Sequence, residues 1–379
     1  MDGKRGFSRR QFVGGAAAAI GYMGLKPTAE LYAEDRFPFR RRLDDEYDAL
    51  AHLSSNENPY GPSQKVMEAM EGAWKYSMRY GYPDGDIQAA IAEHHGVPED
   101  HILMGAGSGE ILRVVGLTYM DPGSKVIGVE PSYSTVYRHA AGLMAEAITL
   151  PLMEDHRQSI PLMIQTTKTH HREVGFVYLC TPNNPTGVSV TAAETKQLND
   201  NIPQDVPILI DEAYHHFVED PAYETSVPYV LDGRNVIIAR TFSKIYGMAG
   251  LRLGYAIARP DIIRRMREYS TGTINALVKH GAAAALKDPE AEKWVFDTTL
   301  RLRKKAVADV EAMGFEVLPS ETNFFMMHTG RPAAEVRNAF REKGVAVGRD
   351  FPPMLDWLRV SIGTEEEMER FMTGLKEIF

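Results

Sequence analysis

The chain has 379 residues, of which 44% are hydrophobic and 25% charged, so it can bury large cores and fits one large plus one smaller domain. Its formal net charge of −9 excludes the basic footprint of a nucleic-acid-binding protein. The single cysteine, Cys180, excludes an internal disulfide and a cysteine-based metal site.

The amino terminus carries the pattern of an export signal. Residues Ser8 to Val13 read SRRQFV, and an alanine-rich stretch from Gly14 to Leu25 follows, too short to cross a membrane as a helix. The pattern resembles the twin-arginine export motif, which implies a signal segment at residues 1–29 and a periplasmic or otherwise exported protein without stable membrane anchoring. A frayed basic arm on a cytoplasmic protein is the alternative.

A charged, irregular arm precedes the first predicted helix. Its last part, Leu53 to Ser63, reads LSSNENPYGPS, and the prolines and glycine there exclude regular structure. Ser63 can cap a helix from Gln64 to about Met78. The apolar side chains of this helix form one stripe, which predicts packing in the core: Val66, Met67, Met70, Ala73 and Trp74.

A glycine-rich turn follows next. The run from His101 to Glu110 reads as a short strand, a turn and the start of a helix that continues to about Tyr119. Backbone N–H groups at such a helix start, with the helix dipole behind them, can bind a phosphate. The candidate contacts are Gly107, Ser108 and Gly109, although many such turns only reverse the chain.

Three apolar runs predict buried strands: Lys125 to Val129, Val174 to Leu179 and Val206 to Asp211. The third run ends in a carboxylate. At the carboxyl end of a central strand, such a group faces the crevice in which α/β proteins bind ligands. Asp211 is therefore a candidate site residue, with a helix cap as the alternative role.

A possible metal site beside this strand is rejected. Glu212, His215 and His216 offer ligand atoms, but adjacent histidines point in different directions on either a helix or a strand. We therefore expect no metal.

The lysine at position 244 carries most of the functional interpretation. It follows a β-branched run from Asn235 to Ala239 that predicts a buried strand, and a second apolar run extends from Leu253 to Ala258. Partial burial would lower the pKa of Lys244 and leave its amine able to attack a carbonyl. Side chains suited to a phosphate surround it: Thr241, Ser243 and Arg252. A lysine Schiff base beside a phosphate clamp describes the anchoring of pyridoxal phosphate, although most Ser-Lys pairs at strand ends are solvated turn residues.

The carboxyl-terminal part predicts alternating helices and strands after a hinge at Ser270 to Asn275. The expected helices are Ala276 to Leu286, Trp294 to about Met313, Pro332 to Lys343 and Glu365 to Phe379. The expected strands lie within Val317 to His328 and Trp357 to Gly363. On the second helix, a cluster of cations is expected to be solvated: Arg301, Arg303, Lys304 and Lys305.

The spacing T-F-S-K-x-x-x-x-A-G-L-R-x-G, which contains Lys244, resembles the pyridoxal-phosphate lysine motif of class I/II aminotransferases. S-x-N-E-N-P-x-G-P-S, N-P-T-G and D-E-A-Y extend the likeness over about residues 50–379, closest to the histidinol-phosphate aminotransferase group. The resemblance implies a fold-type-I α/β protein with a mainly parallel sheet in the large domain and a smaller α/β domain. It divides the chain into an arm at 30–63 that joins the small domain, a large cofactor-binding domain at 64–270 and a small domain at 271–379.

The resemblance also implies the activity and the catalytic residues. A pyridoxal-phosphate-dependent aminotransferase would move an amino group between an amino acid, or a similar amine, and a 2-oxo acid. Lys244 would form the Schiff base and move the proton, and Asp211 would pair with the pyridine nitrogen. Tyr214 and Asn184 would contact the phenolate oxygen, and Tyr133 would stack on the ring.

The same likeness assigns the cofactor phosphate and the assembly. Its contacts in the subunit would be Gly107, Ser108, Gly109, Thr241, Ser243 and Arg252. Tyr82, in a segment that resembles the group's R-Y-P-D, would reach the phosphate of a neighbouring subunit. This implies a homodimer with shared active sites. Gly109 stands where the group has aspartate, so only backbone contacts carry over at that position.

Two arginines are the candidate substrate ligands. Arg359, in L-R-V-S-I-G-T, matches the arginine that grips the substrate carboxylate, and Arg349 is a candidate for a second acidic group. The resemblance also places three other side chains at the substrate pocket: Asn58, Tyr60 and Asn184. The loop between the arginines contains Phe351-Pro352-Pro353 and departs from the histidinol-phosphate enzymes, which leaves the amino donor open.

Two other classes of function stay open. A decarboxylase, C–S lyase or cyclising synthase would keep the same fold and cofactor but break a different bond. A non-catalytic binding protein, of the kind found in regulators with an aminotransferase-like half, would need a DNA-binding module, which we do not expect ahead of Asn56.

Overall fold

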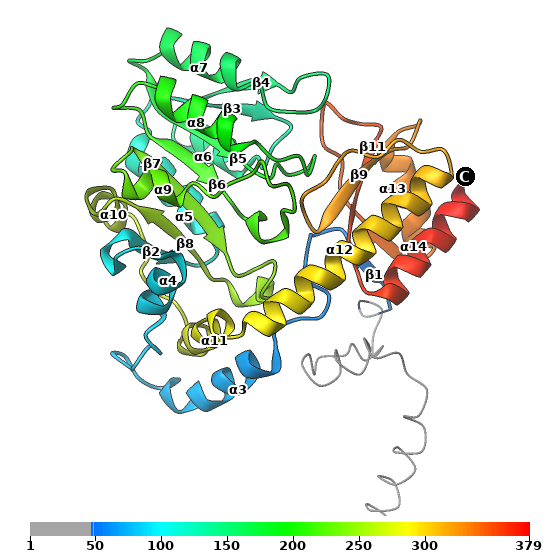
Figure 1. Cartoon of the computed structure of the whole chain (residues 1–379), viewed down its shortest axis with the longest axis horizontal. Coiled ribbons are helices and arrows are strands. Elements are labelled where there is room, and N and C mark those ends of the chain that lie inside the picture. The colour runs from blue at the N-terminus through cyan, green and yellow to red at the C-terminus, as the bar shows by residue number, and fades with distance from the viewer. Residues whose placement is uncertain (1–46, 48) are drawn as a thin grey trace, which may run out of the picture.

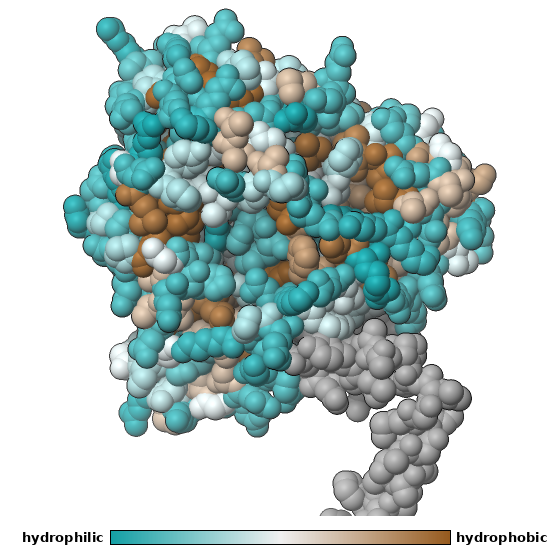
Figure 2. All heavy atoms as spheres, in the orientation of Figure 1, coloured by the Kyte–Doolittle hydropathy of each residue, from teal (hydrophilic) through white to brown (hydrophobic). Residues whose placement is uncertain are grey.

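The structure has two α/β units, and the larger one surrounds a seven-stranded sheet (Figure 1). This computed structural model describes Tyr47 and residues 49–379, so the predicted signal segment at 1–29 and most of the arm lie outside the described residues. Within the described part, no helix is long and apolar enough to span a membrane. Hydrophilic side chains cover most of the face shown in Figure 2.

The central sheet has the strand order β2-β8-β7-β6-β5-β3-β4. The last five strands in this order are mutually parallel, whereas β8 is antiparallel to both of its neighbours. The strand bounds are β2 (Ile102–Gly105), β3 (Lys125–Glu130), β4 (Glu146–Pro151), β5 (Val174–Cys180), β6 (Ile208–Asp211), β7 (Val236–Thr241) and β8 (Gly254–Ala258). The predicted mostly parallel α/β sheet is therefore confirmed.

Helices cover both faces of this sheet because alternate strand residues point to opposite sides. Leu209 and Ile237 pack in one hydrophobic cluster, and the next residues, Ile210 and Ile238, pack in the other. The first cluster includes α5 (Ser108–Tyr119), α6 (Thr135–Gly142) and α10 (Pro260–Arg267). The second includes α4 (Ile87–His95), α7 (Ile160–Thr169), α8 (Ala192–Asn201), α9 (Val227–Leu231) and α11 (Ala276–Leu286).

The first helix, α3 (Gln64–Ala73), packs on α11 and buries Val66 and Ala73 as predicted. Trp74 is not a core residue: its exposed fraction is 62%. The α-helix ends at Ala73 and a 3₁₀ turn, η2 (Trp74–Tyr76), follows, so the helical period that placed Trp74 on the apolar stripe no longer applies.

The smaller unit contains two short sheets. In one, β1 (Ala51–Leu53) pairs in parallel with β10 (Val345–Val347), so the end of the arm contributes a strand to this unit. In the other, β9 (Phe324–His328) is antiparallel to β11 (Trp357–Ser361). Two helices cover them: α13 (Ala333–Glu342) and α14 (Glu365–Ile378). The predicted domain boundaries, between 63 and 64 and between 270 and 271, stay predictions.

A long helix, α12 (Pro289–Ala312), contacts both cores. Arg301, Lys304 and Lys305 on it are exposed as predicted, but Arg303 is only 5% exposed. Its Nη1 donates to the carbonyl oxygen of Thr322 at 2.6 Å, and Nη2 lies 3.4 Å from a Glu219 carboxylate oxygen. The expectation of a solvated Arg303 was wrong because these loops cover its side of the helix.

Candidate active site

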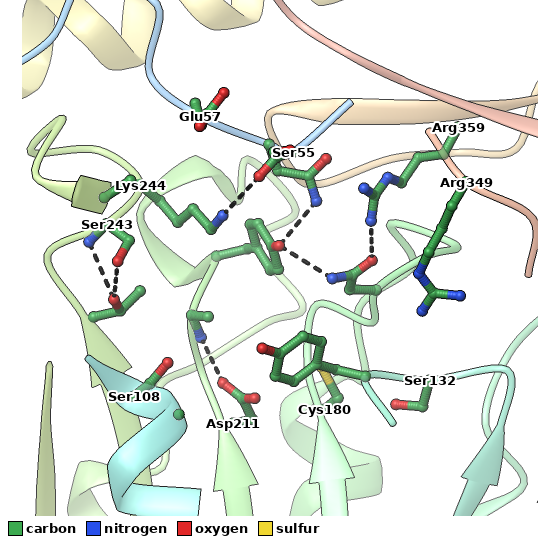
Figure 3. Close-up of a pocket in the computed structure, with 18 of the residues that line it drawn as sticks. Ser55, Glu57, Ser108, Ser132, Cys180, Asp211, Ser243, Lys244, Arg349 and Arg359 are labelled. Carbon is green, nitrogen blue, oxygen red and sulfur yellow. Dashed lines mark hydrogen bonds between the residues drawn. The ribbon is translucent and has the colours of Figure 1, made fainter. Parts of the chain in front are cut away.

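A cavity of about 290 Å³ lies where three neighbouring strands of the central sheet end (Figure 3). The last residues of β5, β6 and β7, which are Cys180, Asp211 and Thr241, all line it. In Figure 3, Lys244 and Ser243 approach from one side and Arg349 and Arg359 from the other, with Asp211 beneath them. Residues from distant parts of the sequence thus meet at the carboxyl edge of the parallel strands, as expected for an α/β protein.

Lys244 follows the end of β7 and extends into the cavity. Its Nζ donates to the carbonyl oxygen of Ser55 at 3.2 Å and lies 5.6 Å from the centroid of the Tyr214 ring. Burial, together with the positive charge of Arg359, lowers the pKa of Lys244 to about 8. The uncharged amine is therefore much more populated near neutral pH than in an ordinary, solvated lysine.

Asp211, on the cavity floor, is almost completely buried. One carboxylate oxygen accepts a hydrogen bond from the hydroxyl of Tyr178 at 3.1 Å, and the other accepts one from the backbone N–H of Ala213 at 3.3 Å. Burial raises the pKa of Asp211 to about 6, although both hydrogen bonds and the charge of Lys244 oppose that rise. The cavity therefore presents a carboxylate on its floor and an amine at its wall.

The glycine turn before α5 forms another wall of the cavity. Ser108 and Gly109, the first residues of the helix, line the cavity with backbone N–H groups that no earlier helical turn satisfies. Gly107 lies behind them with a φ angle of 81°, and a Cβ atom there would lie 2.2 Å from Nη2 of Arg252. Because Gly107 has no Cβ, the guanidinium group of Arg252 can approach the amino terminus of α5 this closely.

Two hydroxyls complete this polar wall. Thr241 Oγ1 donates to Ser243 Oγ at 2.9 Å, and both side chains are buried and line the cavity. Nη1 of Arg252 lies 3.5 Å from the same Ser243 oxygen and donates to the carbonyl oxygen of Ala249 at 2.9 Å. Helix N–H groups, hydroxyls and a guanidinium converge here, which is the donor set that holds a phosphate.

Two amide side chains meet at the Tyr214 hydroxyl near the centre of the cavity. That oxygen accepts hydrogen bonds from Asn56 Nδ2 at 2.9 Å and Asn184 Nδ2 at 3.3 Å. The proton of the hydroxyl is thereby left for donation to a ligand. Tyr133 also lines the cavity and is partly exposed, so a face of its ring is open to a planar group.

Arg359 is buried in the wall formed by the smaller unit. Its Nη1 donates to Asn184 Oδ1 and its Nη2 to the Ser54 carbonyl oxygen, both at 2.6 Å. Within the described part of the chain, its buried Nε has no hydrogen-bond partner. Burial lowers the pKa of Arg359 to about 10, which keeps the side chain charged at neutral pH. A fixed guanidinium with an unused donor is prepared to bind an anion.

Phe351 lies between the two arginines of the cavity. The guanidinium carbon of Arg349 lies 4.4 Å from the Phe351 ring centroid, and that of Arg359 lies 4.7 Å from it. Arg349 is exposed and donates only to the neighbouring Asp350 carbonyl oxygen among the hydrogen bonds of the described residues. Its head group is consequently less fixed than that of Arg359.

Besides Gly107, three predicted site residues do not line this cavity. Asn58 donates to the carbonyl oxygen of Ile245 at 2.9 Å, and Tyr60 packs edge-on against a tryptophan ring at 4.7 Å. The Tyr82 hydroxyl donates to the Ile274 carbonyl oxygen at 2.7 Å. All the other predicted site residues line the cavity, except Gly107, which lies directly behind it.

Several cavity residues were not among the predicted site residues: Ser55, Asn56, Glu57 and Ser132. The first three belong to the same S-x-N-E-N-P stretch as Asn58. Asn56 has a φ angle of 54°, so the arm turns at this residue and directs this end of the motif into the cavity. Asparagine tolerates that left-handed conformation better than most residues, which is the available sequence signal.

Residues 49–375 match the family Aminotransferase class I and II. The chain belongs to this family. A histidinol-phosphate aminotransferase from Symbiobacterium thermophilum is 36% identical over 86% of this chain and 90% of its own length. An aromatic amino acid aminotransferase from Thermobifida fusca is 33% identical over 85% of this chain and 89% of its own length. The predicted aminotransferase activity and the likeness to the histidinol-phosphate group are confirmed.

A solved structure of a histidinol-phosphate aminotransferase has the same fold as this chain. The crystal structure of histidinol-phosphate aminotransferase from Sinorhizobium meliloti, in complex with pyridoxal 5′-phosphate, superposes with a TM-score of 0.80 at 27% identity. The match covers 87% of this chain and 90% of that chain. The fold-type-I architecture predicted from the sequence is therefore confirmed.

Proposed function

We propose that the cavity holds pyridoxal 5′-phosphate between Asp211 and Lys244, with the phosphate at the start of α5, and exchanges amino groups between an amino donor and a 2-oxo acid. One observation carries this assignment: a buried carboxylate, a lysine with a lowered pKa and a cationic phosphate cradle line one cavity. The chain is an aminotransferase of the histidinol-phosphate aminotransferase kind, and pyridoxal phosphate is its cofactor.

The residues present fit this cofactor. The hydroxyls of Thr241 and Ser243, the guanidinium of Arg252 and the N–H groups at Ser108 and Gly109 form the cradle for its phosphate. When bound, pyridoxal phosphate supplies an aldehyde for amines and a ring that takes up electrons from the reacting carbon. The carboxylate of Asp211 is placed to keep the ring nitrogen protonated, and the exposed face of Tyr133 is placed to contact the ring.

Lys244 has two tasks in this proposal. Its uncharged amine attacks the aldehyde, and the same amine, once displaced by the incoming donor, removes and returns the proton on the substrate carbon. The lowered pKa suits both tasks because the amine carries no proton in a useful fraction of molecules near neutral pH. Tyr214 and Asn184 are placed to donate hydrogen bonds to the oxygen on the cofactor ring.

Arg359 is the proposed ligand of the substrate carboxylate, because its buried Nε has no partner among the described residues and its fork is fixed by Asn184. Arg349 is the proposed ligand of a second acidic group on the substrate. Asn58 and Tyr60 act on the substrate indirectly in this proposal, since they hold the arm that carries Asn56.

A stoichiometric assay tests the function. Purified protein is incubated with 2-oxoglutarate and a panel of donors that includes histidinol phosphate and aromatic amino acids, and both glutamate and the oxidised donor are measured. We expect one glutamate for each donor consumed. Release of carbon dioxide or a thiol without glutamate would show a decarboxylase or C–S lyase instead, and no reaction with any donor would favour a binding protein.

We further propose a homodimer with shared active sites. Tyr82 does not line the cavity of its own subunit, and the preceding segment exposes three large apolar side chains: Trp74, Met78 and Tyr80. A partner covering this segment would bury them and could bring Tyr82 to its own cofactor phosphate. Light scattering should give twice the chain mass, and Trp74→Glu with Met78→Glu should give monomers that retain pyridoxal phosphate poorly. A native monomer with full activity would refute the proposal.

We also propose that residues 1–29 act as a twin-arginine signal and that the mature enzyme is exported. The support is the Arg9-Arg10 pair followed by an apolar stretch. In a host with that pathway, the native protein should appear in the periplasmic fraction, and Arg9→Lys with Arg10→Lys should keep it in the cytoplasm. Equal distribution of the two proteins would exclude the signal.

A further inference from the structure

A tyrosine beneath the cavity contacts Asp211 without lining the cavity itself. Tyr178 lies on β5 and is almost completely buried. Its hydroxyl donates to Asp211 Oδ2 at 3.1 Å, and the only other hydrogen bond to this carboxylate within the described residues comes from the Ala213 N–H. The side chain of Tyr178 therefore supplies one of the two hydrogen bonds that the Asp211 carboxylate receives from the described part of the chain.

The position of this phenol is fixed by the sheet. β5 and β6 are parallel neighbours in which Cys180 is paired with Asp211, so Tyr178 lies two residues before the position opposite the carboxylate. Its ring packs edge-on against Tyr137 at 5.8 Å, and the Tyr137 hydroxyl donates to the Val129 carbonyl oxygen at 2.9 Å. Packing and strand register together hold the Tyr178 hydroxyl against one oxygen of Asp211.

We propose that Tyr178 is a positioning residue for the reaction: its hydroxyl orients the Asp211 carboxylate and stabilises its charged form for the cofactor ring nitrogen. The proposal rests on the role proposed above for Asp211. It goes further because Tyr178 contacts neither the cofactor cradle nor the substrate arginines, and acts only through Asp211.

Charge and burial explain why this contact matters. Desolvation favours the neutral acid at Asp211, and each hydrogen bond donated to the carboxylate favours the anion. Burial raises the pKa of Tyr178 well above its usual value, so this group stays a donor throughout the working range of pH. The other titratable groups that interact with Asp211 are Cys180, Glu212, Tyr214 and Lys244, and none of their side chains donates a hydrogen bond to it among the described residues.

Removing the hydroxyl should therefore raise the pKa of Asp211. In a Tyr178→Phe enzyme the carboxylate keeps only the Ala213 N–H bond, and the neutral acid is populated at higher pH than in the native enzyme. A neutral acid cannot form an ion pair with a protonated ring nitrogen, so the cofactor is held less tightly. The Tyr178→Phe enzyme should then release bound pyridoxal phosphate at a pH at which the native enzyme retains it.

The test measures the rate at which holoenzyme releases pyridoxal phosphate, followed by absorbance between pH 5.5 and 8.5. For native enzyme we expect faster release as the pH falls and Asp211 takes up a proton. We call this low-pH part of the release profile the acid limb. Tyr178→Phe should shift the acid limb to higher pH by about one unit, so that at a given pH within it the variant releases the cofactor about tenfold faster than native enzyme. Tyr137→Phe is the control, because it removes a hydrogen-bonded hydroxyl from the adjacent ring without touching Asp211.

The outcomes separate this proposal from the function itself. An unshifted limb in Tyr178→Phe, or an equal shift in Tyr137→Phe, overturns the positioning role, whereas a shift in Tyr178→Phe alone supports it. Asp211→Asn should remove the acid limb, and if it does not, the proposed role of Asp211 fails as well. Thermal melting of each variant identifies a general loss of packing, which would lower the melting temperature of both phenylalanine variants without moving the limb.

Discussion

The side of the cavity that belongs to the large unit consists mainly of strand ends, whereas the opposite side, called the rim here, consists of the arm, the loop with Arg349 and Phe351, and Arg359 of β11. Asp211 and Thr241 are held by the register of neighbouring buried strands, Asp211 opposite Cys180 and Thr241 opposite Gly254. Ser55 and Arg349, across the cavity, lie in the loops that follow the short strands β1 and β10, and Arg349 has an exposed side chain. Strand ends hold side chains in fixed positions, as a cofactor that stays bound requires. Loops can move, as substrates that enter and leave at the rim require.

A buried ion pair behind the cavity adds to the rigidity of the strand-end side. Arg240 on β7 contacts Glu212, the residue after β6, through two nitrogen atoms at 2.6 and 3.1 Å, and both side chains are almost fully buried. The rim has no equivalent in its described residues, where Arg349 has no carboxylate partner. The comparison therefore predicts that changes on the strand-end side cost more than changes at the rim.

The largest effect is expected at the reactive amine. Lys244→Ala should lower the rate of transamination by at least about 10⁴-fold, because it removes both the nucleophile and the proton carrier. Single-turnover assays with saturating donor measure this loss. Lys196→Ala, on the surface of α8, is the control and should keep the native rate. Normal turnover by Lys244→Ala would exclude the proposed mechanism.

The buried ion pair should come next. Arg240→Met leaves Glu212 charged in the core and should lower the free energy of unfolding by about 3–5 kcal/mol, measured by chemical denaturation. Lys196→Met breaks a surface pair with Asp200 and should leave the free energy of unfolding close to the native value, because an exposed ion pair is screened by solvent. Equal losses in the two variants would mean that the strand ends do not depend on this pair.

A smaller effect is expected at the buried arginine of the rim. Arg359→Lys keeps a charge but loses the fork that contacts Asn184 and the Ser54 carbonyl, so kcat/KM for amino acid and 2-oxo acid should fall about 10²-fold. Retention of pyridoxal phosphate should not change. Loss of the cofactor together with the substrate would contradict the division of the cavity into two sides.

The smallest effect is expected at the exposed arginine. Arg349→Gln should lower kcat/KM less than about tenfold for donors with one carboxylate, because an exposed charge contributes little. A donor with a second acidic group should lose more, which a comparison of two donors on the same preparation measures. Identical losses for both donors would remove Arg349 from substrate recognition.

The same contrast explains what could be predicted from the sequence. Asp211 ends one apolar run, and Asn184 and Lys244 follow two others; because the three runs form neighbouring strands, the meeting point of these residues follows from the strand order. The positions of Asn58 and Tyr60 depend on the left-handed turn at Asn56, which a motif does not disclose. Phe351 enters the cavity because a small cluster that includes Trp357 holds its loop, and this packing is tertiary.

Sequence patterns within a single helix also gave wrong predictions of burial for two residues, Trp74 and Arg303. Trp74 fits the helical stripe only if the helix continues past Ala73, and burial of Arg303 depends on a loop more than eighty residues earlier, at Glu219. The edge strand β4 went unpredicted because its exposed residues lack a regular apolar alternation. Helix α8 could have been found from its capping box, in which Thr191 and Glu194 bond each other's backbone N–H groups.

Helix α12 has a mechanical consequence. Its 24 residues extend over about 36 Å, with Ala291 and Val295 embedded in one core and Leu302 and Val310 in the other. Because α12 is packed into both cores, a rotation of the smaller unit relative to the larger one would have to tilt or bend this helix. The proposed contact of Arg359 with the substrate carboxylate is therefore linked, through this helix, to the unit that carries Lys244. A glycine at Thr298, midway along the helix, should weaken that link while leaving the packing of both ends in place.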